Sequence, residues 1–323
     1  MKIVVLDGHE VNPGDLSWEP LKELGELEVY ERTPEEKIME RAEGADIILT
    51  NKIEFTAERI AKLPNLKYIG VQATGYNIVD IEAAAEKGII VTNVPAYSTD
   101  SVAQFVFALT LEIAHHVGEH NRVVKAGKWS KAEDFCFWEY PLIELKGKSM
   151  GIIGYGNIGQ RTAEIALAFG LKVIVYDRSP AKKIAAEDIM TAQIEFLELE
   201  ELYDKADIIS LHCPLTKETE GLINQASISK MKDGVIIINT ARGGLIVEED
   251  LKTALDNGKV YGAAVDVLAN EPPSQDNPLL KSDKTIITPH IAWASKETRQ
   301  RLLDIVVENI KSFINGQPIN QVN

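Results

Sequence analysis

The sequence predicts an α/β protein built from two doubly wound domains, each with a parallel sheet. Three observations support this fold class. Short apolar runs alternate with segments of helical spacing in both halves of the chain, and a glycine-rich turn at residues 154–159 follows one of these runs. The chain has 323 residues, more than one hydrophobic core usually serves. We therefore expect one domain before the glycine turn and a second domain around it.

The first hundred residues contain four clear strand candidates with helix candidates between them. The strand candidates are the apolar runs at residues 2–7, 45–51, 66–72 and 88–95, and helical spacing occurs at residues 34–44 and 78–88. Such alternation predicts a parallel sheet with helices on both faces. We assign residues 1–99 and 296–323 to this first domain, because a final helix at 296–315 is expected to pack back on it.

One long helix is predicted at the start of the second domain, from residue 100 to about residue 127. Its apolar residues cover more than one stripe, which usually indicates a second contact, here another subunit. Residues 128–145 follow it and are irregular and rich in aromatic side chains. We therefore expect a homodimer in which this helix takes part.

The glycine turn lies inside a strand, helix and strand unit that spans residues 148–177. Gly154 lets the chain turn tightly, Gly156 keeps side-chain atoms away from a pyrophosphate, and Gly159 lets the helix approach the strand. Unpaired amides at a helix N-terminus favour an anion. Here these amides belong to Tyr155, Gly156, Asn157 and Ile158. The unit is therefore interpreted as a dinucleotide site at the start of a second domain, which we assign to residues 100–295.

An acid at the end of this unit indicates which dinucleotide is preferred. Asp177 follows the glycines by about 20 residues, where a carboxylate accepts both ribose hydroxyls and repels a 2′-phosphate. Arg178, directly after it, could instead accept a 2′-phosphate. We expect NAD, with NADH preferred over NADPH, and Arg178 keeps the alternative open.

Further strand candidates follow the glycine unit, at residues 206–214, 234–241, 261–267 and 284–290. Their continuous apolar character is typical of strands buried on both faces. In doubly wound sheets, functional residues come from loops beyond the carboxyl ends of the strands. Three of these loops carry residues suited to the chemistry of a bound nicotinamide, namely Arg242, Glu271 and His290.

The three residues suit hydride transfer to a ketone that is held by a carboxylate group. The planar guanidinium of Arg242 matches a carboxylate with two donors. His290 carries a proton that is mobile near neutral pH, and a contact with Glu271 would orient the imidazole ring and favour its charged form. Each residue alone would be ordinary, as a salt-bridge arginine, a capping histidine or a solvated acid. After successive strands of one nucleotide-binding domain, the three together predict a catalytic set.

Composition and charge exclude several classes of protein. The net charge of −15 argues against binding to nucleic acid and to an anionic membrane surface. The longest apolar stretch, at residues 102–117, is too short and too polar to span a bilayer. Two cysteines, Cys136 and Cys213, fit a reducing compartment, and a strand pattern begins at Lys2 with no leader before it. We expect a cytoplasmic protein without a metal site.

Several motifs together resemble the family of D-isomer-specific 2-hydroxyacid dehydrogenases. In the second half these are GIIGYGNIG, HCPLT, NTARGGLIVEEDL, AAVDVLANEPP and TPHIAWAS, and in the first half VQATGYNIVDIEAAAEKGIIVTNVPAYSTDSVAQF. The resemblance covers nearly the whole chain. It implies a flavodoxin-like substrate domain and a Rossmann NAD-binding domain.

The resemblance also implies roles for individual residues. Arg242 would bind the 2-oxo acid, His290 would be the acid and base, and Glu271 would be its partner. Backbone amides around Ala73, Thr74 and Gly75 would hold the substrate carboxylate. Cofactor contacts would come from Ile158, Cys213, Pro214, Thr240, Ala241, Arg242, Asp266 and His290. From the residues alone, the loop at 73–75 is a plain loop and Asp266 equally a strand-end cap.

Two segments, FCFWEYPLIELKGK and LTNK, are most similar to the glycerate dehydrogenases, or hydroxypyruvate reductases, of this family. This similarity implies reduction of hydroxypyruvate or glyoxylate to D-glycerate or glycolate. It makes Lys52 a candidate substrate contact. Trp138 is the candidate for an aromatic side chain that reaches the partner subunit's substrate pocket, or else a packed interface residue.

Alternatives stay open for the substrate. Another small 2-oxo acid, of the D-lactate or 3-phosphoglycerate type, would suit the same residues. A formate substrate is disfavoured, because formate dehydrogenases of this superfamily carry a glutamine at the position of Glu271. An NAD-sensing binding protein, similar to co-repressors that share the fold, is the alternative outside enzymes.

Overall fold

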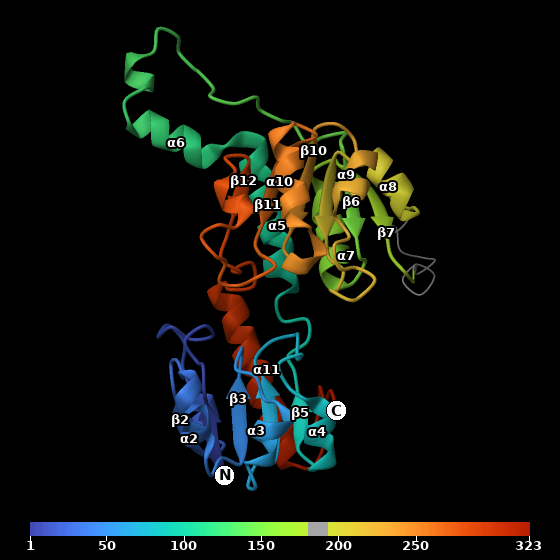
Figure 1. Ribbon diagram of the computed structural model, residues 1–323. Coiled ribbons are helices and arrows are strands. Elements are labelled where there is room, and N and C mark those ends of the chain that lie inside the picture. The colour runs from blue at the N-terminus through green and yellow to red at the C-terminus, as the bar shows by residue number, and fades with distance from the viewer. Residues whose placement is uncertain (180–192) are drawn as a thin grey trace. The chain divides into compact units, whose positions relative to one another are not determined.

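The computed structural model describes residues 1–179 and 193–323 and divides into two compact units (Figure 1). Unit 1 contains Met1–Ser98 and Trp293–Asn323, and unit 2 contains Thr99–Ala292. Each unit has one parallel sheet, of five strands in unit 1 and seven in unit 2. The predicted fold class is confirmed. The boundaries assigned from the sequence, at residues 99 and 296, lie close to those of the units.

The sheet of unit 1 has the strand order β2-β1-β3-β4-β5, which is the flavodoxin-like order. Its strands are β1 (Lys2–Val5), β2 (Glu26–Val29), β3 (Ile47–Thr50), β4 (Tyr68–Val71) and β5 (Ile90–Thr92). Its helices are α1 (Glu19–Lys22), η1 (Glu35–Lys37), α2 (Ile38–Ala42), α3 (Ala57–Ala61), α4 (Ile81–Glu86) and α11 (Lys296–Ile314). All the strands that pair in this sheet are parallel.

Alternating side chains of β1 are buried on opposite faces of this sheet. Ile3 and Val5 pack with Leu302 and Val306 of α11, whereas Val4 belongs to a second cluster on the opposite face. The last helix therefore packs on the first unit although it is distant in sequence, as its periodicity predicted. The edge strand β2 was not predicted, because its sequence, ELEV, is half acidic and leaves no residue fully buried.

The sheet of unit 2 has the order β12-β11-β10-β9-β6-β7-β8, a Rossmann arrangement extended by one strand. Its strands are β6 (Ser149–Ile153), β7 (Lys172–Tyr176), β8 (Ile194–Phe196), β9 (Ile208–Leu211), β10 (Val235–Asn239), β11 (Val260–Val265) and β12 (Thr285–Ile287). The helices that accompany them are α7 (Asn157–Ala168), α8 (Leu199–Lys205), α9 (Gln225–Lys230), η5 (Gly243–Leu245), α10 (Glu248–Asp256) and η6 (Pro278–Lys281).

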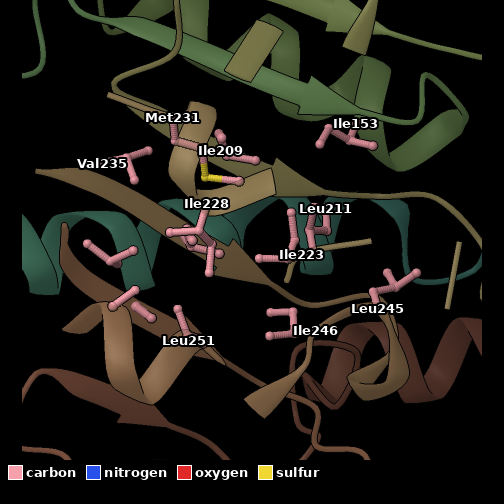
Figure 2. Close-up of a cluster of buried hydrophobic side chains, with 14 of the residues drawn as sticks. Ile153, Ile209, Leu211, Ile223, Ile228, Met231, Val235, Leu245, Ile246 and Leu251 are labelled. Carbon is pink, nitrogen blue, oxygen red and sulfur yellow. The ribbon is translucent and has the colours of Figure 1, made fainter. Parts of the chain in front are cut away.

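One face of this sheet is covered by α8, α9 and α10, which close a continuous apolar core. Figure 2 shows Ile209 and Leu211 of β9 among Ile228, Ile246 and Leu251 from the covering segments. The other face packs on α5 (Thr99–His115) and α7. The strand β6 lies where the strand order reverses, between β9 and β7, and this is where doubly wound sheets bind their ligands.

The prediction of one long helix from residue 100 to residue 127 is wrong. The helix α5 ends at His115, and a second helix, α6 (Val117–Lys125), follows. Between them His116 has left-handed backbone angles, φ 47° and ψ 44°, which interrupt a right-handed helix. The Glu112 carboxylate accepts a hydrogen bond from the Gly118 amide, at 3.1 Å, and so stabilises the break.

Beyond this break, α6 and η2 (Trp129–Lys131) form an arm that extends away from the sheet of unit 2 (Figure 1). Eight residues of α5 are buried, whereas every residue of α6 is exposed or half-buried. None of the helices in the described ranges has the length and apolar character to cross a membrane.

Candidate active site

The glycine turn after β6 has the shape that a pyrophosphate requires. Gly154 has a φ of +98°, and a Cβ there would lie 2.7 Å from the backbone nitrogen of Cys213. A Cβ on Gly159 would lie 2.2 Å from the carbonyl oxygen of Gly154, so strand and helix meet closely. A Cβ on Gly156, the N-cap of α7, would point into open space. The turn therefore fits a dinucleotide, with room at Gly156 and helix amides from Asn157 and Ile158 onward. The prediction of an unpaired Tyr155 amide is wrong, because this amide donates to Asp177.

Asp177 stands directly after β7, and two backbone amides fix its carboxylate beside the glycine turn. Its Oδ2 accepts from the Tyr155 amide at 2.7 Å, and its Oδ1 accepts from the Ser179 amide at 2.8 Å. Arg178 is exposed on the same edge. The pKa of Glu218 is lowered mainly by a hydrogen bond from Thr216, with a smaller contribution from the charge of Arg178. Asp177 and Arg178, which bear on cofactor choice, are consecutive residues, and Asp177 contacts the glycine turn at Tyr155.

The segment after β9 lies against the same turn. The His212 amide donates to the carbonyl oxygen of Ile153 at 2.8 Å. Burial raises the pKa of the Cys213 thiol to about 11, and the nearby charge of Asp177 adds to this shift. Cys213 is half-buried and Pro214 exposed, so both can contact a nucleotide held by the turn.

Arg242 is presented by a turn that a buried asparagine organises. Asn239 ends β10, and its Oδ1 accepts from the Ala241 amide at 3.0 Å while its Nδ2 donates to the Arg242 carbonyl at 2.8 Å. The Arg242 side chain is exposed, and its Nη1 donates to the Ala241 carbonyl at 2.6 Å. The Thr240 hydroxyl is buried without a hydrogen-bond partner among the described residues, which fits a contact with a bound cofactor. The organising role of Asn239 was missed, although an asparagine at the end of an apolar strand signals such a turn.

Glu271 and His290 are in direct contact. The Nδ1 atom of His290 lies 2.6 Å from Oε2 of Glu271, and Oε1 of Glu271 accepts from the Leu268 amide at 3.1 Å. The two residues follow β11 and β12, neighbouring strands whose carboxyl ends meet at one edge of the sheet. Because Nδ1 faces a carboxylate, it carries the hydrogen, and Nε2 is the nitrogen suited to proton exchange.

Asp266 holds the backbone that carries this histidine. Its Oδ1 accepts from the Thr288 hydroxyl at 2.6 Å and from the Ile291 amide at 2.9 Å, and its Oδ2 accepts from the Ala292 amide at 2.8 Å. Its backbone oxygen accepts from the His290 amide at 2.8 Å, and His290 has a φ of 55°. Burial raises the pKa of Asp266, although these hydrogen bonds oppose the shift. The interpretation of Asp266 as a strand-end cap was therefore apt, and its cofactor contact stays a prediction.

The predicted substrate residues of the first domain all lie in unit 1, after β3 and β4. Lys52 belongs to a turn whose amides donate to the buried carboxylate of Asp7, with 2.7 Å from the Lys52 amide to Oδ2. Ala73, Thr74 and Gly75 follow β4, and the Thr74 hydroxyl donates to the Val94 carbonyl at 2.9 Å. Asp7 was not predicted as an organiser of this turn. The substrate contacts of Lys52 and residues 73–75 stay predictions.

Trp138 lies in the irregular segment that follows η2, and 65% of its surface is exposed. It belongs to unit 2, as do Arg242, Glu271 and His290. Its predicted role in a partner subunit's pocket is not tested within a single chain.

Comparison with known proteins shows the family of the chain. Residues 107–292 match the family described as D-isomer specific 2-hydroxyacid dehydrogenase, NAD binding domain. A hydroxypyruvate reductase of Blautia hydrogenotrophica is 54% identical over 328 residues, which cover 100% of both chains.

Two solved structures are also similar. A D-lactate dehydrogenase of Aquifex aeolicus, complexed with NAD and lactic acid, has a TM-score of 0.81 at 33% identity and covers 98% of this chain and 96% of its own. An acyclic imino acid reductase in complex with NADPH and D-Arg has a TM-score of 0.85 at 33% identity and covers 100% of both chains. The predicted family is confirmed by these matches. The chain belongs to the D-isomer specific 2-hydroxyacid dehydrogenases, oxidoreductases that act on a CH–OH group with a nicotinamide dinucleotide.

Proposed function

We propose that this chain reduces hydroxypyruvate, and glyoxylate as a second substrate, to D-glycerate and glycolate with NADH. The observation that carries the proposal is the 2.6 Å contact between His290 and Glu271, in the same unit as Arg242 and the glycine turn. The full-length likeness to a hydroxypyruvate reductase supports the choice of substrate.

A dinucleotide held by the glycine turn and Asp177 would supply a hydride for the carbonyl carbon of the 2-oxo acid. His290 then donates a proton from Nε2 to the carbonyl oxygen, which becomes the hydroxyl group of the product. The Glu271 carboxylate holds the hydrogen on Nδ1 and stabilises the positive charge of the imidazolium before transfer. In the reverse direction, neutral His290 takes the proton back.

Arg242 is proposed to bind the 2-oxo acid. Its guanidinium is exposed on a turn that Asn239 fixes, so its donors can reach a small anion without first leaving a buried ion pair. A guanidinium offers two parallel hydrogen bonds to a carboxylate, which fixes the orientation of the carbonyl group. This contact also draws electrons from the carbonyl and favours hydride addition.

NADH is proposed as the preferred cofactor because Asp177 presents a carboxylate where the adenosine ribose would lie. The carboxylate is fixed by the Tyr155 and Ser179 amides, so it cannot readily move away from a 2′-phosphate. Arg178, exposed next to it, is the residue that would support NADPH. Comparing kcat/KM for NADH and NADPH tests this preference.

A homodimer formed through the arm is proposed as well. Several large apolar side chains of the arm and the segment after it are exposed, namely Val117, Trp129, Phe135, Trp138, Tyr140 and Leu142. Large apolar side chains that stay exposed along one segment favour an interaction surface there. Sedimentation equilibrium should give twice the chain mass of 35.7 kDa, and a single-chain mass at micromolar concentration would contradict the proposal.

The test of the proposed activity is a steady-state comparison of kcat/KM across 2-oxo acids. The panel contains hydroxypyruvate, glyoxylate, pyruvate and 3-phosphohydroxypyruvate, each with NADH. Hydroxypyruvate should give the highest kcat/KM, and chiral analysis should identify the product as D-glycerate. Higher kcat/KM with pyruvate or the phosphorylated acid would reassign the substrate, and no turnover with any acid would refute the proposed activity.

A further inference from the structure

Glu271 stands on an exposed loop. The chain from Ala269 to Asp276 is exposed at every residue, between buried Leu268 and buried Asn277. Exposed loops usually have several accessible conformations, whereas proton chemistry needs a fixed distance between the partners. Something must therefore hold the two ends of this loop if Glu271 is to stay 2.6 Å from His290.

A single carboxylate, that of Glu248, contacts both ends of the loop. Its Oε1 accepts from the Ala269 amide at 2.9 Å, and its Oε2 accepts from the Asn277 side-chain Nδ2 at 2.7 Å. Ala269 lies two residues before Glu271 and Asn277 lies six residues after it. The two oxygens of the Glu248 carboxylate thus connect the two ends of the loop. We call this pair of hydrogen bonds, to Ala269 and Asn277, the clasp.

Glu248 and Asn277 lie beside elements that are anchored in one buried apolar cluster. Glu248 is the first residue of α10, whose Leu251 and Leu255 are buried in the same apolar cluster as Leu279 of η6. The Asn277 Oδ1 accepts from the Leu279 amide at 2.9 Å, so the amide group is oriented with Nδ2 toward Glu248. A hydrogen bond between such anchored elements limits how far the loop can move.

The backbone around the loop is also packed against the segment that carries Arg242. A Cβ on Gly243 would lie 1.9 Å from the carbonyl carbon of Leu268, so only a glycine permits this approach. The Leu268 amide in turn donates to Glu271. Gly243 and Glu248 follow Arg242 within one short stretch. The segment that carries Arg242 therefore also carries the two residues that contact the ends of the Glu271 loop.

From this geometry we propose that Glu248 is a positioning residue, which holds Glu271 against His290 by clasping both ends of the loop between Ala269 and Asn277. The catalytic consequence rests on the proposed function, whereas the clasp itself does not. Without the clasp the carboxylate of Glu271 spends less time beside Nδ1. His290 then loses the partner that orients its ring for part of the time, and kcat of the reduction falls.

Three variants test the role of Glu248. Glu248→Ala removes both hydrogen bonds. Glu248→Gln keeps one oxygen that accepts, but its side-chain NH2 group faces the other donor, either the Ala269 amide or Asn277 Nδ2. Glu249→Ala is the matched control, because Glu249 is exposed in the same first turn of α10 and its loss changes the charge equally. Thermal unfolding of each variant checks the fold, and Glu248→Gln serves if the alanine variant is unstable.

Two measurements read out the position of Glu271. The first is the pH profile of kcat and KM for hydroxypyruvate reduction with NADH. The second is an NMR titration of selectively ¹³C-labelled histidine, with the His290 signal assigned by His290→Asn. The titration reports the pairing of His290 with Glu271 whether or not the protein turns over the proposed substrate.

The expected result for Glu248→Ala is a fall in kcat of about tenfold with a small change in KM for NADH. The NMR signal of His290 should differ from that of the wild type, with Glu248→Gln intermediate and Glu249→Ala like the wild type. If Glu248→Ala titrates like the wild type, the clasp is refuted even where turnover falls. If the wild type shows no turnover but the titration moves, the proposed function fails and the clasp stands.

Discussion

The Nδ1 atom of His290 and the Oε2 atom of Glu271 lie 2.6 Å apart, across two loops that follow neighbouring strands. The second oxygen of the carboxylate is occupied by the Leu268 amide. Asp266 fixes the histidine side of the contact through four hydrogen bonds to the chain from Thr288 to Ala292. The contact is thus supported from both sides, and both oxygens of the Glu271 carboxylate take part in it.

Replacing Glu271 with glutamine should remove the charge and one of the two acceptors. The glutamine oxygen can still accept from Nδ1, but the side-chain NH2 group then faces the Leu268 amide and His290 loses its negative partner. We expect kcat for hydroxypyruvate reduction to fall about tenfold to a hundredfold while KM for NADH changes little. Steady-state kinetics measure both constants, and an unchanged kcat would show that the carboxylate has no role in the reaction.

Replacing Asp177 with asparagine should change the cofactor preference. The side-chain oxygen can still accept from the Tyr155 amide, while the charge that repels a 2′-phosphate is lost. We expect the ratio of kcat/KM for NADPH over NADH to rise about tenfold, equivalent to ~1.4 kcal/mol. Arg178→Ala is the companion variant and should lower the same ratio. A wild-type preference for NADPH would contradict the role assigned to Asp177.

The two cysteines should differ in their reactivity toward iodoacetamide. Burial raises the pKa of Cys213 to about 11, so only about one thiol in a thousand is ionised at pH 8. Cys136 is exposed. Peptide mass spectrometry over time should find Cys136 alkylated first and Cys213 slowly, and more slowly still with NADH present. Modification of Cys213 before Cys136 would show that the Cys213 thiol is not buried.

Acid should destabilise the protein through His212, whose pKa burial lowers to about 4. Its Nε2 lies 2.8 Å from the Ser210 hydroxyl. An unfolded histidine binds its proton near pH 6.5, so between pH 6.5 and 4 the unfolded chain holds more protons than the native one. Stability is therefore lost as pH falls through this window, by up to ~3 kcal/mol from this residue.

Urea unfolding at several pH values measures this loss. The variant His212→Gln cannot titrate, so its unfolding free energy should fall less between pH 6.5 and 4 than that of the wild type. Equal slopes for the two proteins would show that His212 is protonated as easily in the native state as in the unfolded chain.

Much of the fold followed from the sequence because its determinants are local. The β-branched runs, the helical spacing between them and the three glycines each specify their own segment. The break at His116 did not follow, because it depends on a carboxylate one turn away that accepts from the Gly118 amide. The edge strand β2 escaped because alternating acidic residues at a sheet edge have no apolar run to signal them.

The residues of the candidate site could be predicted from their positions in the sequence, but the hydrogen bonds that hold them could not. Arg242, Glu271 and His290 were found because each follows an apolar strand of one nucleotide-binding domain. The contacts of Glu248 connect residues that are 21 and 29 positions apart, and no local pattern reports such pairing. Asp7 was missed for the same reason, since the amides from which it accepts are 44 to 46 positions away. Asn239 was missed although its partners, the Ala241 amide and the Arg242 carbonyl, are local.

The most direct test of the account compares the wild type with His290→Ala in hydroxypyruvate reduction by NADH. Turnover measures the chemistry, and quenching of protein fluorescence measures NADH binding in the same preparations. The account predicts that kcat falls by about a thousandfold or more while the Kd for NADH changes by no more than about twofold. A variant that keeps the wild-type kcat would contradict the assignment of His290 as the proton donor.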